Sequence, residues 1–268
     1  MPATTYHRPA SIPEAARIAA TEPEAKLLAG GQSMLPAMRL GLSMTSGFID
    51  LSGVAELAGI RADAKALHVG AMTTHASVAA SAEVRSRLPV LARLAAEIGD
   101  PQVRNCGTIG GSIANSDPAA DYPAAVLALG ATVRTNARTI AADAFFTGLF
   151  TTALKAGELI TAVEFPYPDR AAYLKMRQPA SRFALVGVCV AQFGKSVRVA
   201  VTGAGPCVFR ATALEQALGA RFAAESCASV RIDPAALNDD LHASAEYRAH
   251  LIGVLARRAV ERALGSAS

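Results

Sequence analysis

Two glycine-rich segments carry residue types that suit the binding of a phosphate-bearing ligand. Ala29-Gly30-Gly31-Gln32-Ser33 and Thr108-Ile109-Gly110-Gly111-Ser112 lie about 80 residues apart in the chain. Glycine lacks a Cβ atom, so its backbone can take positive φ and approach a ligand closely, while Ser33 and Ser112 each offer a hydroxyl donor. Either segment alone is typical of an ordinary tight turn. Together, each leading into a segment fit to present N–H groups, they predict two turns that hold one diphosphate between them.

Local signals predict a strand before the first turn and a helix after it. Ser11-Ile12-Pro13-Glu14 is a capping box with a proline in the first turn, and it predicts a helix to about Ala20. A short strand over 25–28 should run into the glycine turn, and another strand is expected at 48–50. Ser33 is expected to cap the intervening helix. Four apolar residues of that helix are spaced to form one buried face: Met34, Leu35, Met38 and Leu40.

A second unit begins near Leu57. We expect a strand over 66–71, a short helix over 74–80 and one long helix over 82–98, which Gly99-Asp100-Pro101 ends. The segment 102–121 has almost no bulky apolar residues. It is therefore expected to be a long loop, and loops of that length inside compact domains are usually functional.

Asp121 is expected to cap a helix that reaches Leu129, followed by strands over 131–135 and 159–165. The best candidate for a domain boundary is 166–169, because Pro-Tyr-Pro-Asp continues neither a strand nor a helix cleanly.

A third unit follows this boundary. Segments 184–193 and 196–202 flank Gly194-Lys195 and predict a β-hairpin. Residues 247–264 predict a long amphipathic helix.

Composition bounds the class of protein. The chain has 268 residues, of which 51% are hydrophobic, a composition typical of a folded globular protein with real cores. A net charge of +4 with scattered basic residues and 5% aromatics disfavours a nucleic-acid surface. No apolar run is long enough to cross a bilayer, and the start of the chain does not resemble a signal peptide.

The four cysteines, Cys106, Cys189, Cys207 and Cys227, form no Cys-x-x-Cys pair and no short-range set with the histidines. No metal site is therefore expected in this chain. The cysteines are interpreted as reduced thiols of a cytoplasmic protein, although a disulfide is not excluded by sequence.

Taken together, these segments strongly resemble the FAD-binding medium subunit of molybdenum hydroxylases, the family of aerobic carbon monoxide dehydrogenase and xanthine dehydrogenase flavoproteins. The resemblance covers essentially the whole chain. It rests on the Ala29–Ser33 turn with Leu35-Pro36, on Thr108–Asn115 with Asp117–Asp121, and on Tyr247-Arg248. It implies an α+β fold in which two subdomains, 1–55 and 56–168, clasp FAD. A C-terminal domain of antiparallel sheet with helices, 169–268, would follow.

The resemblance also implies roles for single residues. Both glycine turns, Ala29–Ser33 and Thr108–Ser112, would lie on the pyrophosphate of FAD. Asp121 would contact flavin hydroxyls, although a helix N-cap explains it equally well and the two roles can coexist. Lys175 matches a family lysine near the isoalloxazine ring, where a cation could stabilise the anionic reduced flavin. Without the resemblance, an isolated lysine would be interpreted as solvated surface. No catalytic acid or base is assigned.

The implied function is electron transfer. Relatives work with a molybdopterin-binding large subunit and a [2Fe-2S] small subunit, as a dimer of heterotrimers, and the flavin subunit passes electrons to NAD, oxygen or a quinone. One departure is the short link Gly203-Ala-Gly-Pro206, where relatives often have a longer loop.

Two alternatives stay open: a self-contained flavin-dependent oxidoreductase, and a non-redox nucleotide-binding assembly module. A Rossmann domain is disfavoured, because no Gly-x-Gly-x-x-Gly follows the first strand. Sequence determines neither the organic substrate nor the final acceptor.

Overall fold

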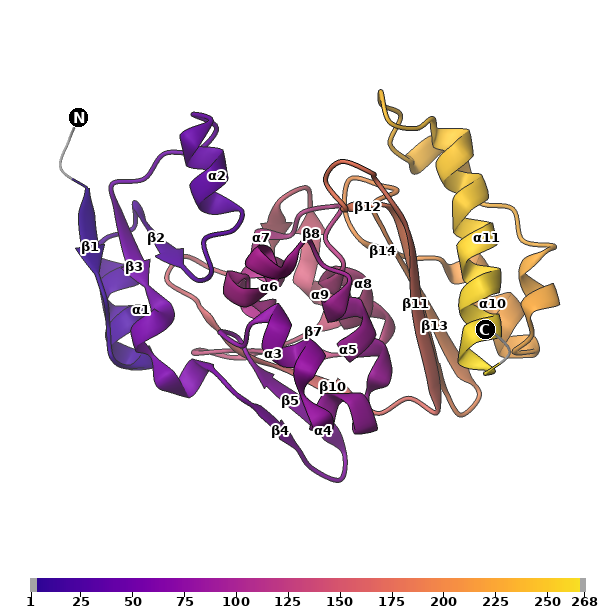
Figure 1. Ribbon diagram of the computed structural model, residues 1–268, viewed down its shortest axis with the longest axis horizontal. Helices are drawn as coiled ribbons and strands as arrows, with labels where there is room; N and C mark the ends of the chain where they lie inside the picture. Colours follow the sequence, from indigo (N-terminus) through magenta and orange to yellow (C-terminus); the bar gives the residue numbers. More distant parts are fainter. Residues whose placement is uncertain (1–3, 266–268) are drawn as a thin grey trace.

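Three main sheets, of three, five and four strands, follow one another along the long axis of the protein (Figure 1). The structure is a computed structural model that describes residues 4–265. We refer to the sheets with their helices as the first, second and third lobes. The α+β class, with a C-terminal antiparallel sheet and helices, is confirmed. Within the described residues, no helix is long and apolar enough to cross a membrane.

The first lobe is a parallel sheet with strand order β1-β3-β2. Its elements are β1 (Thr5–His7), α1 (Ile12–Thr21), β2 (Ala25–Leu28), α2 (Met34–Arg39) and β3 (Gly47–Asp50). The predicted cap by Ser11 is confirmed, since the Glu14 N–H donates to Ser11 Oγ at 3.3 Å. The Glu14 carboxylate accepts from the Ala10 N–H at 2.9 Å, one residue before the position expected in a capping box. Ile18 and Ile49 pack between α1 and the sheet.

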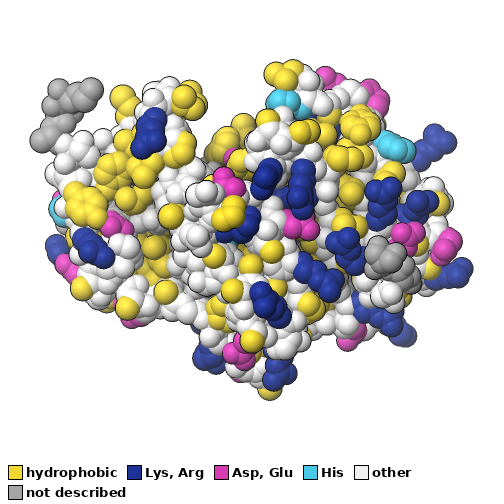
Figure 2. Space-filling model, in the orientation of Figure 1, with side chains coloured by type: hydrophobic (Ala, Val, Ile, Leu, Met, Phe, Trp, Pro, Cys, Tyr) yellow, Lys and Arg dark blue, Asp and Glu magenta, His cyan; other side chains and the backbone are white. Residues whose placement is uncertain are grey.

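The helix α2 differs from its prediction in two respects. Ser33 precedes it but has helical φ and ψ, and its side chain makes no capping hydrogen bond. None of its residues is buried, and Leu35 and Leu40 are 40% and 74% exposed. The prediction that its apolar face is core was therefore wrong, because this short helix stands at the end of the lobe with no element packed over that face. Figure 2 shows hydrophobic side chains gathered over this lobe.

The second lobe has an antiparallel sheet with strand order β4-β5-β10-β6-β7 and a layer of short helices. Its strands are β4 (Ile60–Ala62), β5 (Ala66–Gly70), β6 (Thr132–Thr135), β7 (Thr139–Ala141) and β10 (Ile160–Pro166), with the small hairpin β8 (Phe146–Gly148) and β9 (Thr151–Thr152). Its helices are α3 (His75–Ala80), α4 (Ala82–Arg87), α5 (Pro89–Ala96), α6 (Pro101–Cys106), α7 (Ile109–Asn115), α8 (Tyr122–Ala128) and α9 (Ala142–Phe145).

Two predictions for this lobe were wrong. The single helix expected over 82–98 is split into α4 and α5, because Pro89 has no N–H to continue α4 and instead occupies the first turn of α5. The loop expected over 102–121 contains α6 and α7, whose N-termini are capped by the side chains of Asp100 and Thr108. These helices have only six and seven residues. In α7 the single buried pair of large side chains, Ile109 and Ile113, is too short a pattern to predict a helix, and α6 buries no residue.

The third lobe is an antiparallel sheet between two layers of helix. Its elements are β11 (Arg170–Arg177), β12 (Ala184–Phe193), β13 (Ser196–Thr202), β14 (Phe209–Arg210), α10 (Thr212–Ala220) and α11 (Ala245–Ala263). The predicted hairpin is confirmed, with Gly194 at φ +56°. Along β12, Val188 and Val190 belong to the core beneath α11, whereas Cys189 and Ala191 join the core of the second lobe. The sheet is therefore buried on both faces, which locks the third lobe to the second.

Candidate cofactor site

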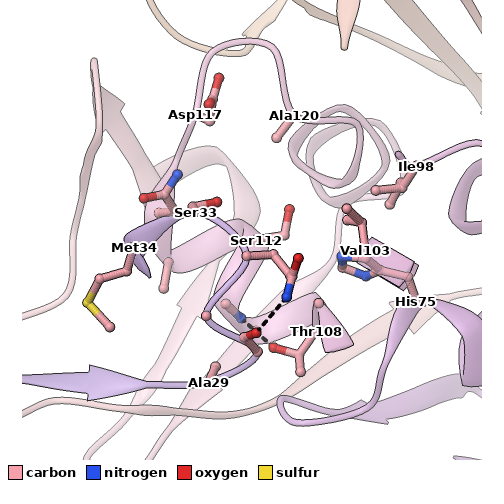
Figure 3. A pocket seen from close by; sticks show the side chains of 18 of the residues that line it. Ala29, Ser33, Met34, His75, Ile98, Val103, Thr108, Ser112, Asp117 and Ala120 are labelled. Carbon is pink, nitrogen blue, oxygen red and sulfur yellow. Dashed lines mark hydrogen bonds between the residues drawn. The ribbon is translucent and has the colours of Figure 1, made fainter. Parts of the chain in front are cut away.

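A cavity of about 660 Å³ lies where the three lobes meet. Both glycine turns line it, together with residues from the start of α6, the segment before α8 and the loop between β11 and β12. Figure 3 shows Ala29, Ser33 and Met34 on one side of the cavity and Thr108 and Ser112 on another, with Ile98 and Val103 further along. Its volume is in the range typical of small-molecule and cofactor sites.

The first glycine turn presents free backbone donors. The N–H groups of residues 30–33 donate to no acceptor among residues 4–265. Gly31 has φ +70°, a conformation that favours glycine, and it turns the chain from β2 towards α2. Four consecutive free N–H groups beside a cavity suit an anion with several oxygens.

The second glycine turn has four of its five N–H groups, those of residues 109–112, already engaged. Ile109 and Gly110 donate to the carbonyls of Thr73 and Ala71, at 3.1 and 2.8 Å. Gly111 and Ser112 donate to the side-chain and main-chain oxygens of Thr108, at 3.1 and 3.0 Å. Two of these N–H groups therefore anchor α7 on the segment between β5 and α3, and the other two cap the start of α7. The Thr108 N–H, the Ser112 hydroxyl and a surface without large side chains remain available to the cavity.

The absence of side chains also lets the two turns approach each other. A Cβ atom on Gly30 would lie 2.1 Å from the Cys106 carbonyl oxygen, and one on Gly111 would lie 3.2 Å from the Ala29 Cβ. A Cβ on Gly110 would lie 2.7 Å from the Ala71 carbonyl oxygen. The glycines thus set the spacing of the first two lobes as well as the shape of the cavity.

Asp121 sits at the wall of the cavity in a buried ionic network. It precedes α8 as predicted, but its side chain makes no capping bond to the helix. Its carboxylate accepts instead from the Tyr173 hydroxyl and, at 2.8 Å, from Lys175 Nζ. Burial raises the pKa of Asp121, while the charge of Lys175 and these hydrogen bonds favour the carboxylate. Gly187, opposite Lys175 on β12, leaves the room that the Tyr173 ring needs.

Lys175 itself is fully buried, so a solvated surface lysine is excluded. Its ammonium group has three donors, and all three are used: one goes to Asp121 and the others to the carbonyls of Glu97 and Arg182, at 3.2 and 3.1 Å. Lys175 does not line the cavity. It lies one layer behind the wall, where it joins the segment before α6 to the loop between β11 and β12.

Other carboxylates of the cavity wall also have partners. Arg138 donates to the Glu158 carboxylate through Nε at 2.9 Å and through Nη2 at 3.1 Å. This pairing lowers the pKa of Glu158 to about 2. Asp117 accepts from the Ala119 N–H at 2.8 Å, while burial raises its pKa. Asp100 caps α6. The wall is therefore largely preorganised before any ligand binds.

His75 is a residue that sequence reasoning missed. It begins α3, lines the cavity and is 4% exposed (Figure 3). Burial, with a smaller effect of the Arg104 charge, lowers the pKa of His75 to about 4, so the ring is neutral at pH 7. Its Nδ1 atom and the neighbouring Tyr122 hydroxyl are buried without a partner among the described residues. A lone histidine after a capping threonine gave no pattern that could have identified it.

Most of the predicted site residues line the cavity. They are Ala29, Gly30, Gly31, Gln32, Ser33, Thr108, Gly110, Gly111, Ser112 and Asp121. Two do not: Ile109 is fully buried in the core of the second lobe, and Lys175 lies behind Asp121. Arg182 and Glu158 line the cavity without having been predicted.

The Lys175–Asp121 pair generates a prediction about stability. Lys175→Met should lower the free energy of unfolding by roughly 3–5 kcal/mol, because it leaves a buried carboxylate unpaired. Adding Asp121→Asn should recover part of this loss. Arg177→Gln, which breaks a half-exposed pair with Glu97, is the matched control and should change stability by less than about 1 kcal/mol. Urea unfolding of the four proteins makes the comparison, and equal losses for Lys175→Met and Arg177→Gln would contradict it.

His75 generates a prediction about pH. Its pKa falls from 6.5 in the unfolded chain to about 4 in the folded chain, so the unfolded state binds more protons as the solution is acidified. The stability of the protein relative to His75→Gln should therefore drop by up to about 3 kcal/mol between pH 7 and pH 4 and level off below that. Unfolding midpoints across this range test it, with exposed His242→Gln as control. Parallel curves for the unaltered protein and His75→Gln would show that the folded His75 titrates normally.

Comparison with known proteins agrees with this geometry. Residues 2–168 match the family described as the FAD binding domain in molybdopterin dehydrogenase, and residues 171–263 match the CO dehydrogenase flavoprotein C-terminal domain. The nicotine 6-hydroxylase medium subunit of Paenarthrobacter nicotinovorans is 35% identical over 277 residues, covering 98% of each chain. The carbon monoxide dehydrogenase medium chain of Afipia carboxidovorans is 34% identical over 283 residues, covering 96% of each chain.

A solved structure of reconstituted CO dehydrogenase from Oligotropha carboxidovorans has a TM-score of 0.89 to this protein, with 32% identity and 99% coverage of each chain. Similarity at this level extends over all three lobes, including both glycine turns and the third sheet. The chain therefore belongs to the family of FAD-binding medium subunits of molybdenum hydroxylases.

Proposed function

We propose that this chain binds FAD with its diphosphate against the first glycine turn and relays electrons within a larger enzyme. The observation that carries the binding mode is the run of free N–H groups at residues 30–33, facing a second turn that has no bulk at Gly111. A diphosphate needs several donors and close backbone approach, and both are present here. The Ser112 hydroxyl adds a donor from the opposite side.

The chemistry of the cavity favours one orientation of the cofactor. Leu27, Leu51, Met72 and Leu159 line the end beside the first lobe and pack into or against the core of that lobe. Asp121, Gly99 and Arg182 line the end beside the third lobe, which we call the polar end, together with the apolar side chains of Ile98 and Phe183. The isoalloxazine ring has broad apolar faces and one edge of carbonyl and imide groups, so we place it at this end, which offers both kinds of contact, and the adenine at the other end.

Bound FAD supplies an electron carrier that accepts two electrons and can release them one at a time. The residues of this chain bind and orient it: the first turn holds the diphosphate, and Asp121 offers a carboxylate fixed by Tyr173 and Lys175. The cavity wall also holds its carboxylates in fixed hydrogen bonds, so charges near the ring do not rearrange during electron transfer. His75 is kept neutral by burial and contributes no charge at pH 7.

We propose that the organic substrate is oxidised outside this chain. Among the described residues, no group of three or more His, Cys, Asp or Glu side chains could hold a metal ion. Glu158 and Asp121 of the cavity wall are paired with Arg138 and Lys175, and Asp100 and Asp117 accept from backbone N–H groups, so these carboxylates have structural roles in the wall. This supports the inference that a molybdopterin-binding large subunit and a [2Fe-2S] small subunit supply the chemistry and the electrons.

Two further aspects of the assembly are proposed. The exposed apolar residues of α2 adjoin the cavity and support contact with a partner chain within a dimer of heterotrimers. The four cysteines have no disulfide, as is typical of a reducing compartment, and this supports a cytoplasmic location.

The diphosphate assignment is tested by two left-handed glycines. Gly31 and Gly41 have φ of +70° and +72°, so an alanine meets the same backbone strain at either position, but only Gly31 lines the cavity. At Gly31 the new Cβ would also lie 2.8 Å from Cδ1 of Leu35, the flexible end of an exposed side chain that can move aside. Gly31→Ala should weaken FAD binding by roughly 10- to 100-fold, through loss of one or two hydrogen bonds to a charged group. Gly41→Ala should bind FAD like the unaltered chain. Fluorescence titration measures both, and similar affinities for the two variants would refute the assignment.

The dependence on partners is tested with the isolated chain. It should bind FAD and yet leave the flavin oxidised when mixed anaerobically with candidate purines, aldehydes or carbon monoxide. Addition of the molybdopterin and iron–sulfur chains should restore bleaching of the flavin absorbance by the substrate of the complex. Rapid bleaching in the isolated chain would instead favour a self-contained flavin-dependent oxidoreductase.

A further inference from the structure

The loop between β11 and β12 carries a strained residue at the polar end of the cavity. Arg182 has φ +62°, in the left-handed region that non-glycine residues rarely adopt. The loop is tightly bonded around it: the Arg182 N–H donates to the Gln178 carbonyl at 2.8 Å, and the Gln178 N–H donates to the Phe183 carbonyl at 2.9 Å. A strained residue that its surroundings hold in place often has a functional reason.

Two cations connect this loop to the segment before α6. Buried Lys175 donates to the carbonyls of Arg182 and Glu97, and so fixes the backbone on both sides. The Arg182 guanidinium donates through Nη1 to the Gly99 carbonyl at 3.3 Å, and it lies at the cavity wall. The third ammonium donor of Lys175 is used by Asp121, so Lys175 has no donor left for a ligand.

The two cations at this end of the cavity, Lys175 and Arg182, differ in how far their charges are neutralised. The charge of Lys175 is balanced by the Asp121 carboxylate at 2.8 Å. Arg182 forms no ion pair among the described residues and makes a single hydrogen bond, to a carbonyl, so most of its five N–H donors are free. The other cation of the cavity lining, Lys26, belongs to β2, and its ammonium group donates to Ser43 in the first lobe.

We propose that Arg182 is the residue whose charge favours the reduced form of the bound flavin, and that Lys175 is a positioning residue that holds Arg182 and Asp121 in place. This inference rests on the proposed binding of FAD in the stated orientation. Reduction by an external donor adds two electrons and one proton to the flavin at neutral pH, so the ring gains one negative charge. A guanidinium at the polar end stabilises that charge, and because Arg182 is exposed the effect should be modest and weaken with salt.

The test compares variants that suit a left-handed backbone with one that keeps the charge. Arg182→Asn and Arg182→Gly remove the cation, and both residues tolerate positive φ. Arg182→Lys retains the charge with the same strain as arginine. Arg177→Gln removes one positive charge from the same strand system, outside the cavity, and is the matched control.

Two quantities are measured on the full chain loaded with FAD. One is the dissociation constant for oxidised FAD, and the other is the midpoint potential of the bound flavin, determined by anaerobic reduction with dithionite. Together they give the ratio of affinities for reduced and oxidised FAD. Arg182→Asn and Arg182→Gly should lower this ratio roughly fivefold at low salt, and less at 0.5 M salt. Arg182→Lys should restore most of it, and Arg177→Gln should change it by less than about twofold. A tenfold change in the ratio corresponds to about 30 mV for this two-electron couple.

An unchanged ratio in both Arg182→Asn and Arg182→Gly would overturn the assignment, and so would an equal change in Arg177→Gln. Failure of the unaltered chain to bind FAD would instead contradict the proposed function, and with it the role of Arg182 that rests on it.

Discussion

Close contact of the first glycine turn with the end of α6 and with the second glycine turn is the constraint on which the rest of the structure depends. A Cβ on Gly30 would lie 2.1 Å from the Cys106 carbonyl oxygen, so no side chain fits there, and a Cβ on Gly111 would lie within 3.2 Å of the Ala29 side chain. This contact brings the first lobe against the second and leaves the free N–H groups of residues 30–33 at the wall of the cavity. The same packing that joins the lobes thus leaves a row of free backbone donors at the cavity.

The two glycine turns are alike in sequence, but their N–H groups differ in what they bind. The N–H groups of the second turn anchor α7 on the Ala71 and Thr73 carbonyls, whereas those of the first turn stay free. A similar division holds for the cations at the polar end. Lys175 is buried, paired and fully hydrogen-bonded, while Arg182 is exposed and almost unpaired. In both cases one member uses its donors to hold the wall together, and the other keeps donors free at the cavity.

Sequence predicted the fold class, the longer central strands and most helices, because hydrophobic periodicity and capping residues act locally. The two glycine pairs, which form a phosphate-binding pattern, placed both turns at the cavity. Sequence did not predict β11, which carries Lys175, or the short edge strands such as β1, β4 and β7. It failed at α2, whose apolar residues have no partner surface within the described residues, and at α6 and α7, which are too short for a clear helical period. Lys175 could be matched to the family, but its burial depends on long-range contacts with Glu97 and Asp121 that no local pattern contains. His75 and Arg182 were missed for the same reason.

Because the third sheet is buried on both faces, the three lobes are expected to open in a definite order when the protein is heated or pulled. Because β12 contributes Cys189 and Ala191 to the core of the second lobe, the third lobe cannot separate from the second without exposing that large core. The first lobe is joined to the second by one small core, which includes Leu57 and Leu159, and by the contacts around the cavity, so it is expected to be the first part of the chain to open. A ligand that spans the cavity would then stabilise the contact between the first and second lobes. Loss of the cofactor and opening of that contact would be one cooperative event.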